Sequence, residues 1–513
     1  MIPTKLNLAA YLLDARLAEG RGDRIAIRSG GRTFSYADVA RRSAQIAHVL
    51  HADDVRPEER VIVALPDGVD FVAALFGILR RGSVAVMVNP DTTPELLRYF
   101  FHYTRASAAF VPAEGLERFQ AQAEGLPCSP RLYPVASPEF SARLETQPGE
   151  FAPFDADRDD AAIWLFSGGT TGRPKAVVQT HRSFVNTTVL YGHGVLGVGP
   201  DDITISVPKL FFGYATGTNV FFPFSVGASC VLFPERCTPD SLFAQIALHR
   251  PTILINVPTM IQQMVSHDGA ASADLSSVRL ATSAGEPLPP ELHERWMRAF
   301  GVELLDGLGT AEMWHIFISN RPGDVVPGTL GRVVRGFEVK LCDADGREVG
   351  DGEIGALWVK GESRAIGYWH QMDDTMRVFR GEWCVPGDML RRNADATFTY
   401  CGRCDDMLKV HGRWLAPSEV ENCLIAHPAV GEVAVVGATD SNGLVSACAF
   451  VVATAPSPTL ADELKAFVRS RLDHYKSPRD VVFLDALPRT HLGKVDRGAL
   501  GRMHQRDVGS QPR

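Results

Sequence analysis

A glycine-rich segment combines the residue types that bind phosphate groups. It follows an apolar run at 161–166 and consists of Ser167-Gly168-Gly169-Thr170-Thr171-Gly172-Arg173-Pro174-Lys175. Its glycines allow a tight loop whose backbone N–H groups point inward, while the hydroxyl groups add donors and the lysine adds a positive charge. The segment therefore predicts a phosphate-binding loop after a buried strand, in preference to a glycine-rich surface loop.

The same segment does not fit a Walker A loop. That motif requires Gly before its Lys and Ser or Thr after it, whereas here Pro174 precedes Lys175 and Ala176 follows it. A phosphate loop of another type is therefore expected.

Five later segments also combine glycines with acidic, hydroxyl or basic residues. They are Ser283-Ala284-Gly285-Glu286, Asp306-Gly307-Leu308-Gly309-Thr310-Ala311-Glu312, the block from Trp383 to Asp388, Gly402-Arg403-Cys404-Asp405-Asp406-Met407-Leu408-Lys409, and Leu487-Pro488-Arg489-Thr490 with Gly493-Lys494. With the glycine-rich loop, in this order and spacing, they resemble the core motifs of the acyl-adenylate-forming superfamily, which contains acyl-CoA synthetases, peptide-synthetase adenylation domains and luciferases. The resemblance covers essentially the whole chain.

The resemblance implies roles for individual residues. Asp388 is expected to accept hydrogen bonds from the ribose hydroxyls, with Arg403 supporting the same sugar, and Glu312 to hold Mg²⁺, a hard cation that prefers oxygen ligands. Lys494 is expected beside the reacting carboxylate and the α-phosphate, where its charge stabilises the departure of pyrophosphate. The implied catalytic residues are Lys494, Glu312, Thr170 and Lys175. The implied ATP and CoA contacts are Ser167, Gly169, Thr171, Gly172, Gly285, Glu286, Asp306, Gly307, Leu308, Thr310, Asp388, Arg403, Lys409 and Gly412.

The resemblance also implies a hinge at Asp405, about which a small C-terminal domain turns between two half-reactions. This turn withdraws Lys494 and brings the segment Lys409-Val410-His411-Gly412 to the tunnel for the pantetheine arm of CoA. Gly412 would leave room there for the thin arm.

A closer resemblance, to the benzoate-CoA ligase branch, is carried by Lys209-Leu210-Phe211-Phe212-Gly213-Tyr214, by Glu312-Met313-Trp314-His315-Ile316-Phe317, and by Ser319-Asn320-Arg321-Pro322-Gly323-Asp324. In that branch, the matching positions that line the pocket for the aryl carboxylate are Gly213, Tyr214, Gly309, His315 and Ile316. Such a set suits a flat ring, because glycine permits close backbone approach, tyrosine and isoleucine form apolar walls, and His315 can meet a carboxylate or a ring substituent. The alternative is that Tyr214 and His315 only pack in a core.

Several positions depart from the family pattern. Gly168 stands where the family usually has Thr or Ser, Ala176 where it has Gly, and Ala311 where it has Thr. Two phosphate-facing hydroxyls are therefore missing, for which Thr310 and Thr170 can compensate. The Cys-Val-Pro at 384–386 also differs from the usual block. In the aryl pocket, Gly213 stands for an alanine and Trp314 for a leucine. The methyl group missing at position 213 is expected to make room for a ring substituent, so amino- or hydroxybenzoate is as plausible a substrate as benzoate.

These motifs predict an ATP-dependent aryl-CoA ligase that uses ATP, Mg²⁺ and coenzyme A. The aromatic acid would form an aryl-adenylate and pyrophosphate, and the CoA thiol would then release AMP. One alternative is a stand-alone adenylating enzyme that loads a separate carrier protein, since no carrier segment is visible in this chain. A second alternative is a non-catalytic sensor of aromatic acids with a degenerate site, against which Glu312, Asp388, Arg403 and Lys494 argue.

Composition excludes several other classes of protein. The chain has 513 residues, 45% of them hydrophobic, and its 52 basic and 60 acidic residues give a formal net charge of −8. A mildly acidic chain without a long basic run is unlike nucleic-acid binders and binders of anionic membranes. Nine scattered cysteines and the lack of a convincing signal peptide favour a reducing, cytoplasmic location. The uncharged stretch 210–234 contains glycines and a proline, and it is expected to form buried strands and loops rather than a membrane span.

The pattern along the chain indicates which elements position these residues. Short apolar runs alternate with helical periodicity, with strands expected at 61–65 and 84–88 and helices at 69–80 and 93–104. Ser35 and Asp38 predict a capped helix start. This alternation predicts an α/β fold with packed parallel sheets, followed by a β-rich subdomain and a small mobile α+β domain. The expected division is residues 1–403 for ATP and aryl-acid binding and 404–513 for the mobile domain that carries Lys494, with disorder after Met503.

Overall fold

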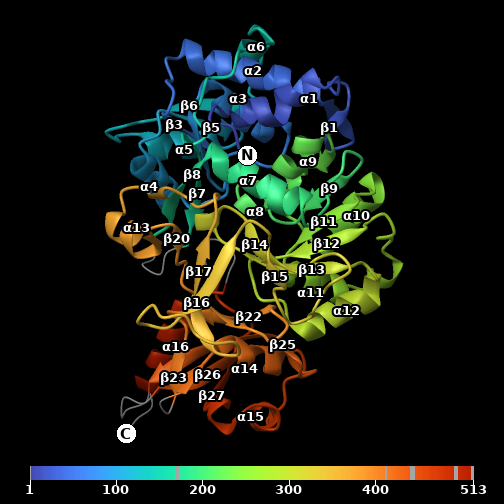
Figure 1. Cartoon of the computed structure of the whole chain (residues 1–513), viewed down its shortest axis with the longest axis vertical. Helices are drawn as coiled ribbons and strands as arrows, with labels where there is room; N and C mark the ends of the chain where they lie inside the picture. The colour runs from blue at the N-terminus through green and yellow to red at the C-terminus, as the bar shows by residue number, and fades with distance from the viewer. Residues whose placement is uncertain (1, 169–172, 411–412, 440–444, 490–494, 510–513) are drawn as a thin grey trace.

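The computed structural model describes residues 2–168, 173–410, 413–439, 445–489 and 495–509 (Figure 1). The first sheet has the strand order β18-β8-β7-β4-β3-β5-β6. Its strands are β3 (Arg60–Val63), β4 (Val84–Met87), β5 (Ala108–Pro112), β6 (Arg131–Val135), β7 (Ala161–Ser167), β8 (Lys175–Thr180) and β18 (Gly367–Tyr368). Strands β7, β4, β3, β5 and β6 are parallel, and β8 and β18 extend the sheet in antiparallel pairing.

Both faces of this sheet are covered, as expected for parallel strands of continuous apolar sequence. Along β3, Val61 and Val63 belong to the core under α2 and α3, whereas Ile62 belongs to the core under α4 and α5. This split follows from the period of two in a strand. The helices on and around this sheet are α2 (Tyr36–Ala52), α3 (Val69–Arg81), α4 (Pro94–Thr104), α5 (Leu116–Ala123) and α6 (Pro138–Glu145). The predicted capping box is confirmed, because Ser35 and Asp38 exchange hydrogen bonds at the start of α2.

A second sheet has the order β15-β14-β13-β12-β11-β9-β10-β1-β2. Its strands are β1 (Ile25–Ser29), β2 (Arg32–Ser35), β9 (Ile203–Ser206), β10 (Ser229–Val231), β11 (Ile253–Asn256), β12 (Leu280–Ser283), β13 (Leu304–Gly309), β14 (Ile316–Ser319) and β15 (Arg332–Val333). One set of helices packs on it through a separate apolar core: α10 (Pro239–His249), α11 (Pro258–Ser266) and α12 (Pro290–Phe300). The other helical segments are η1 (Ala10–Asp14), α1 (Ala15–Ala18), α7 (His181–Thr187), η2 (Thr188–His193), α8 (Gly213–Thr216), η3 (Gly217–Phe221), α9 (Phe222–Val226), η4 (Ala270–Ser272) and η5 (Ala311–Met313).

The prediction of strands and loops at 210–234 is wrong for most of that stretch. The chain is helical through α8, the π-helical segment η3 and α9, and only β10 is a strand. Gly217 allows close packing rather than a turn, since a Cβ atom there would lie 2.5 Å from Cδ2 of His315, whereas Gly227 ends α9 in the left-handed conformation. In the part of the chain that the structure describes, no helix is both long and apolar enough to cross a membrane.

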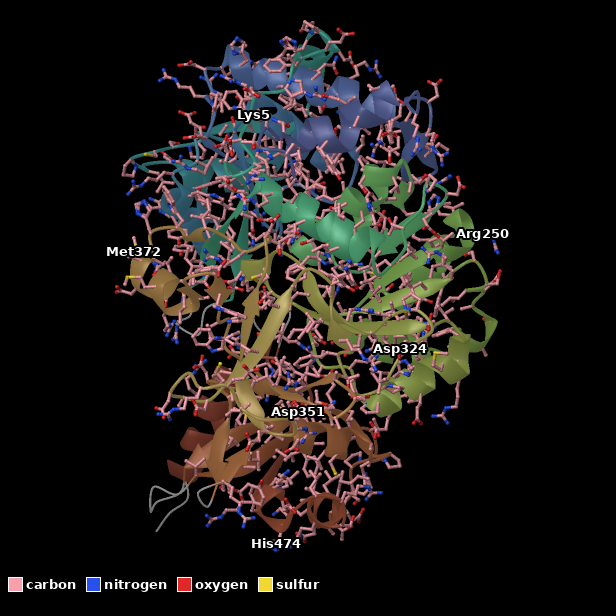
Figure 2. All side chains as sticks on the ribbon, in the orientation of Figure 1. Lys5, Arg250, Asp324, Asp351, Met372 and His474 are labelled. Carbon is pink, nitrogen blue, oxygen red and sulfur yellow. The ribbon has the colours of Figure 1, made fainter. Side chains whose placement is uncertain are left out.

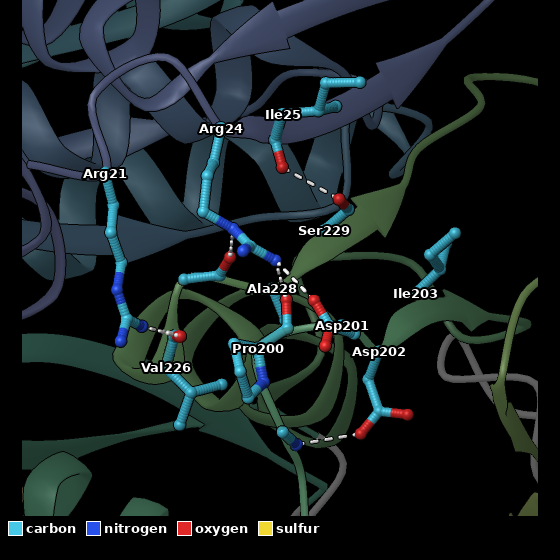
Figure 3. A network of polar contacts seen from close by, with 12 residues as sticks. Arg21, Arg24, Ile25, Pro200, Asp201, Asp202, Ile203, Val226, Ala228 and Ser229 are labelled. Carbon is cyan, nitrogen blue, oxygen red and sulfur yellow. Dashed lines mark hydrogen bonds and ion pairs between the residues drawn. The ribbon is translucent and has the colours of Figure 1, made fainter.

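The N-terminal segment anchors the end of this helical stretch (Figure 3). Arg24 donates from Nε to the carbonyl oxygen of Gly227 over 2.9 Å, and Arg21 donates to that of Val226. Arginine side chains can satisfy the last carbonyls of a helix in this way. The hydroxyl of Ser229 donates to the Ile25 carbonyl oxygen over 2.8 Å, where β10 begins beside β1. The C-terminal end of α9 is therefore held by residues about 200 positions earlier in the chain.

The remaining elements form smaller sheets. An antiparallel sheet contains β16 (Glu338–Cys342), β17 (Ile354–Lys360), β19 (Phe379–Arg380), β20 (Trp383–Cys384), β21 (Asp388–Arg392) and β22 (Phe398–Arg403), with α13 (Met372–Val378) beside it. Below it in Figure 1, coloured orange to red, lie β23 (Leu408–Val410), β24 (Arg413–Leu415), α14 (Pro417–Ile425), β25 (Val430–Thr439), β26 (Val445–Ala453), α15 (Leu460–Arg469), η6 (His474–Lys476), β27 (Asp480–Phe483) and α16 (Arg497–Gly509). These last elements have apolar cores of their own.

The predicted α/β class is confirmed. The division at residues 403 and 404 stays a prediction, supported by the separate sheets and cores on its two sides. The expected disorder after Met503 is wrong up to Gly509, because α16 continues to that residue. Leu500, fully buried within this helix, ties it to the sheet formed by β25, β26 and β27.

Candidate active site

A large cavity of about 2800 Å³ opens where the parallel strands of both large sheets end. Residues that follow β3, β4, β5 and β7 line one side of it, and residues that follow β9, β11, β12 and β13 line the other. Parallel sheets bind ligands at the carboxyl ends of their strands, because the connecting loops meet there. The cavity continues along the start of β21, the end of β22, and α14 and α16.

The structure brings most of the predicted site residues to this one cavity. Those that line it are Ser167, Lys175, Gly213, Tyr214, Gly285, Glu286, Gly307, Leu308, Gly309, Thr310, Glu312, His315, Ile316, Asp388, Arg403 and Asp405. Asp306 is not among the lining residues and is buried beside Gly307, and burial raises the pKa of its carboxyl group. Lys409 lies on β23. The predicted residues Gly169, Thr170, Thr171, Gly172, Gly412 and Lys494 lie outside the described residues.

Glu312 stands in a short turn at the end of β13. The hydroxyl of Thr310 caps this turn by accepting from the backbone N–H of Met313 at 3.3 Å. Only 8% of Glu312 is exposed, and the Tyr368 hydroxyl donates to its Oε1 atom over 2.7 Å. Burial and the Glu312 carboxylate raise the pKa of Tyr368 far above its ordinary value, so the phenol remains a donor. Tyr368 therefore orients the carboxylate that the motif comparison assigned to Mg²⁺.

Lys175, at the C-terminal end of the phosphate loop, already has an anionic partner. Its ammonium group forms an ion pair with Asp374 of α13, and it lies 5.7 Å from the centroid of the Tyr368 ring. The hydrogen bond from Lys175 holds the pKa of Asp374 below its ordinary value. The side chains of both ion-pair partners are mostly buried, whereas Met372 at the start of the same helix points outward at the edge of the molecule (Figure 2). An anion-binding position thus exists at Lys175.

Sequence reasoning missed Tyr368 and Asp374. Both are brought to the loop because β18 pairs with β8, which places Tyr368 opposite Val177, two residues after Lys175. No spacing in the sequence signals that pairing, since β18 and β8 are about 190 residues apart and β18 has only two residues.

The two residues predicted to hold the ribose face each other across paired strands. Asp388 begins β21, and it is in register with Arg403 at the end of β22. The guanidinium of Arg403 lies 3.1 Å from Oδ1 of Asp388, and the Tyr400 hydroxyl lies 3.4 Å from the same atom. Asp388 is buried while Arg403 is partly exposed. The arginine therefore fixes the orientation of a buried carboxylate at the cavity wall.

The predicted aryl pocket combines apolar rings with a neutral histidine. The Tyr214 hydroxyl and Thr282 Oγ1 are hydrogen-bonded at 2.6 Å, and the Tyr214 carbonyl oxygen lies 3.2 Å from Nε2 of His315. A carbonyl only accepts, so Nε2 of His315 carries the proton. Burial lowers the pKa of His315 to about 3, so the ring is uncharged at neutral pH. Both residues pack against other rings and also line the cavity.

Beyond Asp405, two arginines lie on either side of Lys494 in the sequence. Arg497, at the start of α16, pairs with Glu421 of α14 through contacts of 2.5 Å and 2.9 Å. Arg489 pairs with Glu432 of β25 at 2.8 Å, and Arg489 and Val495 form a β-bridge. Residues on both sides of Lys494 in the sequence are therefore fixed to α14 and β25 by ion pairs.

With this geometry in place, comparison with known proteins identifies the family. The model of the AMP-binding enzyme family matches residues 14–369, and the model of the AMP-binding enzyme C-terminal domain matches residues 419–494. The chain belongs to the AMP-binding enzyme family. The predicted relationship to the adenylate-forming superfamily is thereby confirmed.

Relatives of this family member include ligases of aromatic acids. It is 38% identical to a 4-hydroxybenzoate–CoA/benzoate–CoA ligase of Rhodopseudomonas palustris, over 97% of this chain and 94% of that protein. The structure of the anthranilate CoA ligase AuaEII in complex with anthranoyl-AMP superposes with a TM-score of 0.95 at 35% identity, covering 99% of both chains. A benzoate CoA ligase from Burkholderia xenovorans LB400 superposes with a TM-score of 0.90 at 39% identity, covering 97% of this chain and 100% of that one.

Proposed function

We propose that this protein is an ATP-dependent aryl-CoA ligase acting on benzoate or a small substituted benzoate such as 2-aminobenzoate. The observation that carries the proposal is one cavity in which Lys175, Glu312 and the Asp388–Arg403 pair lie with the apolar walls at Tyr214. The charged residues suit a magnesium nucleotide, and the apolar walls suit a flat aromatic acid. The similarity to ligases of benzoate, hydroxybenzoate and anthranilate supports the same substrate class.

In the first half-reaction, a carboxylate oxygen of the aromatic acid attacks the α-phosphorus of ATP. The bond from the α-phosphorus to the bridging oxygen breaks, and pyrophosphate leaves. Lys175 and the loop before it would hold the phosphates, Asp388 would accept from the ribose hydroxyls, and Lys494 would stabilise the charge that develops. His315 is neutral and adds no positive charge to the aryl pocket.

In the second half-reaction, the thiol sulfur of CoA attacks the acyl carbon of the aryl-adenylate. The bond from this carbon to the phosphate oxygen breaks, AMP leaves, and the thiol proton passes to solvent. We infer that the part of the chain after Asp405 turns between the two steps and withdraws Lys494. The assigned roles of Lys409 and Gly412 at the pantetheine arm belong to this second arrangement.

The donor set at Glu312 fits Mg²⁺. This cation usually binds one or two carboxylates together with substrate phosphates and keeps several waters, so a single buried carboxylate at the cavity wall suffices. No group of three or more metal-binding side chains occurs among the described residues. When bound, Mg²⁺ would neutralise phosphate charge as pyrophosphate departs.

The test is pyrophosphate release with MgATP and a panel of acids: benzoate, 2-aminobenzoate, hydroxybenzoates, cinnamate and a medium-chain fatty acid, each with and without CoA. We expect turnover confined to one or two benzoates and formation of the aryl-CoA. Pyrophosphate release without thioester formation would instead indicate a separate carrier protein as acceptor. Preference for the fatty acid would refute the assigned pocket, and no release with any acid would favour a sensor.

The role of Lys494 has its own test. Lys494→Ala should slow adenylation by about 10²–10³, the scale for losing one stabiliser of transition-state charge. Conversion of supplied aryl-adenylate to aryl-CoA should be retained. Equal losses in both half-reactions would contradict the two-arrangement mechanism.

A further inference from the structure

Gly213 lies at a wall of the cavity where another side chain takes the space it leaves. A methyl group added at Gly213 would lie 3.0 Å from Cδ1 of Leu165 and 3.1 Å from Cζ3 of Trp314. Carbon atoms in favourable contact are about 3.5–4.0 Å apart. The space that the missing methyl was expected to leave for a substrate is therefore already bounded by the indole of Trp314 and by Leu165.

Trp314 reaches this position through an unusual backbone turn. Its φ of 67° and ψ of −51° belong to a γ-turn, closed by the His315 N–H donating to the Met313 carbonyl oxygen over 2.8 Å. Such a turn is rare and strained for a residue other than glycine. A strained backbone conformation persists only where the packing around it holds it in place, and such conformations are frequent at functional sites.

The packing that holds the indole in place is extensive. Only 2% of Trp314 is exposed. Its ring meets Phe184 edge-on, with centroids 4.2 Å apart, and lies 5.8 Å from Phe221. Because aromatic rings packed in this way occupy few alternative positions, the indole cannot shift away from a larger residue at position 213 without disturbing α7 and η3.

The position of Trp314 in the chain ties this packing to the site. It lies between Glu312, assigned to the phosphate end, and His315 with Ile316, assigned to the aryl walls. Trp314, Gly213 and Leu165 all line the cavity. The strained turn therefore places the indole of Trp314 at a boundary of the aryl pocket. There it faces Gly213, which has no side chain to occupy that space.

We propose that Trp314 and Gly213 form a complementary pair that sets the size limit of the aromatic acid at this wall. This inference rests on the proposed aryl-CoA ligase function. It assigns to Trp314 the exclusion of acids that carry a substituent at the ring position facing the indole. The accepted class is then benzoates that are unsubstituted at that position, and polar groups such as amino or hydroxyl are accommodated elsewhere on the ring.

The experiment measures kcat/KM for benzoate and its 2-, 3- and 4-methyl derivatives. The variants are Trp314→Leu, Trp314→Phe, Gly213→Ala and the double variant Gly213→Ala/Trp314→Leu. In Trp314→Leu, the ratio of kcat/KM for one methyl isomer to that for benzoate should rise by at least about tenfold, the scale for one methyl group in a hydrophobic pocket. Trp314→Phe should give a smaller rise at the same ring position.

Gly213→Ala tests the pairing without creating a cavity. It should lower kcat/KM for benzoate by about tenfold, because the methyl group presses on the indole. The loss should shrink at least about threefold when Trp314→Leu is also present, and contacts of this kind produce such non-additivity. The matched control is Trp296→Leu, which removes another fully buried tryptophan, in the core under α12. It should lower the melting temperature and leave every substrate ratio unchanged.

Unchanged methyl-to-benzoate ratios in both Trp314 variants, or additive losses in the double variant, would overturn the pairing. If the wild-type protein activates no aromatic acid, the proposed function fails separately. The cycle of wild type, Gly213→Ala, Trp314→Leu and the double variant, read by thermal unfolding, then still decides whether Gly213 and Trp314 are coupled. Independent effects on the melting temperature would refute the inference in that case too.

Discussion

The hydrogen bond from Tyr368 to Glu312 offers a direct test of the proposed metal position. Tyr368→Phe removes a hydroxyl that donates over 2.7 Å to a carboxylate that is 8% exposed. A hydrogen bond to a charged group contributes about 1.5–3 kcal/mol. Removing a partner that orients a metal ligand typically costs about 10–100-fold in metal affinity or activity. We therefore expect the Mg²⁺ concentration for half-maximal pyrophosphate release to rise at least about tenfold.

The assay is a Mg²⁺ titration of pyrophosphate release at saturating ATP and benzoate, with urea unfolding measured in parallel. Tyr133→Phe is the matched control, since the Tyr133 hydroxyl also donates to a carboxylate, that of Asp53, over 2.9 Å. Tyr133 is a buried residue of β6 that packs against Phe140 of α6, and it is not among the residues that line the cavity. It should show a similar loss in the free energy of unfolding and an unchanged Mg²⁺ requirement.

Two results would refute this reasoning. An unchanged Mg²⁺ requirement in Tyr368→Phe, together with the expected loss of stability, would mean that Glu312 does not hold the metal in the reacting complex. A raised Mg²⁺ requirement in Tyr133→Phe would mean that the assay reports general destabilisation.

Three further outcomes are expected. Arg403→Gln removes a hydrogen bond to the buried Asp388 carboxylate. The KM for ATP should therefore rise about tenfold, and the KM for the aromatic acid should stay unchanged. Equal changes in both KM values would contradict the assignment of this pair to the ribose. Burial raises the pKa of Asp67 from 3.8 to about 6. The folded state then binds this proton more tightly than the unfolded state, so the free energy of unfolding falls as the pH rises from about 4 to 6. Asp67→Asn should abolish that fall and, at about 1.4 kcal/mol per pKa unit, stabilise the protein at pH 7 by about 3 kcal/mol. Denaturant titrations at pH 4 and pH 7 measure both effects. If the stability of the variant changed with pH in the same way as that of the wild type, Asp67 would not be the source of the fall. Arg497→Lys cannot keep the bidentate ion pair with Glu421. Adenylation should therefore slow about tenfold, while thioesterification of supplied aryl-adenylate is retained. Equal slowing of the two steps in stopped-flow assays would assign Arg497 a purely structural role.

Much of the fold could be predicted because its signals are local. The helix at Val69–Arg81 and the strand at Val84–Met87 lie within one residue of their expected bounds, since apolar periodicity and a glycine C-cap act within a few residues. The stretch 210–234 was predicted wrongly because its glycines look like turn residues in the sequence. In the folded chain, Gly217 instead allows close approach of His315 from about 100 residues away.

The candidate site divides in the same way. Lys175, Glu312, Asp388 and Arg403 were predicted as site residues from motifs within short segments, and all four line the cavity. The partners of these residues were not, because Asp374 reaches Lys175 only when the two-residue strand β18 pairs with β8.

The sequence by itself thus determined the family and the expected reaction, because six motifs in order and spacing resemble those of the adenylate-forming superfamily. It also predicted which residues bind the nucleotide, and that assignment stays a prediction. Only the tertiary structure decided which side chains hold those residues and which side chains lie against Gly213 at the cavity wall. Gly213 suggested added space in the sequence, yet the packed protein places the indole of Trp314 against it. The physical reason is that pocket volume depends on side chains from distant segments that pack at close to crystal density, which no local pattern records.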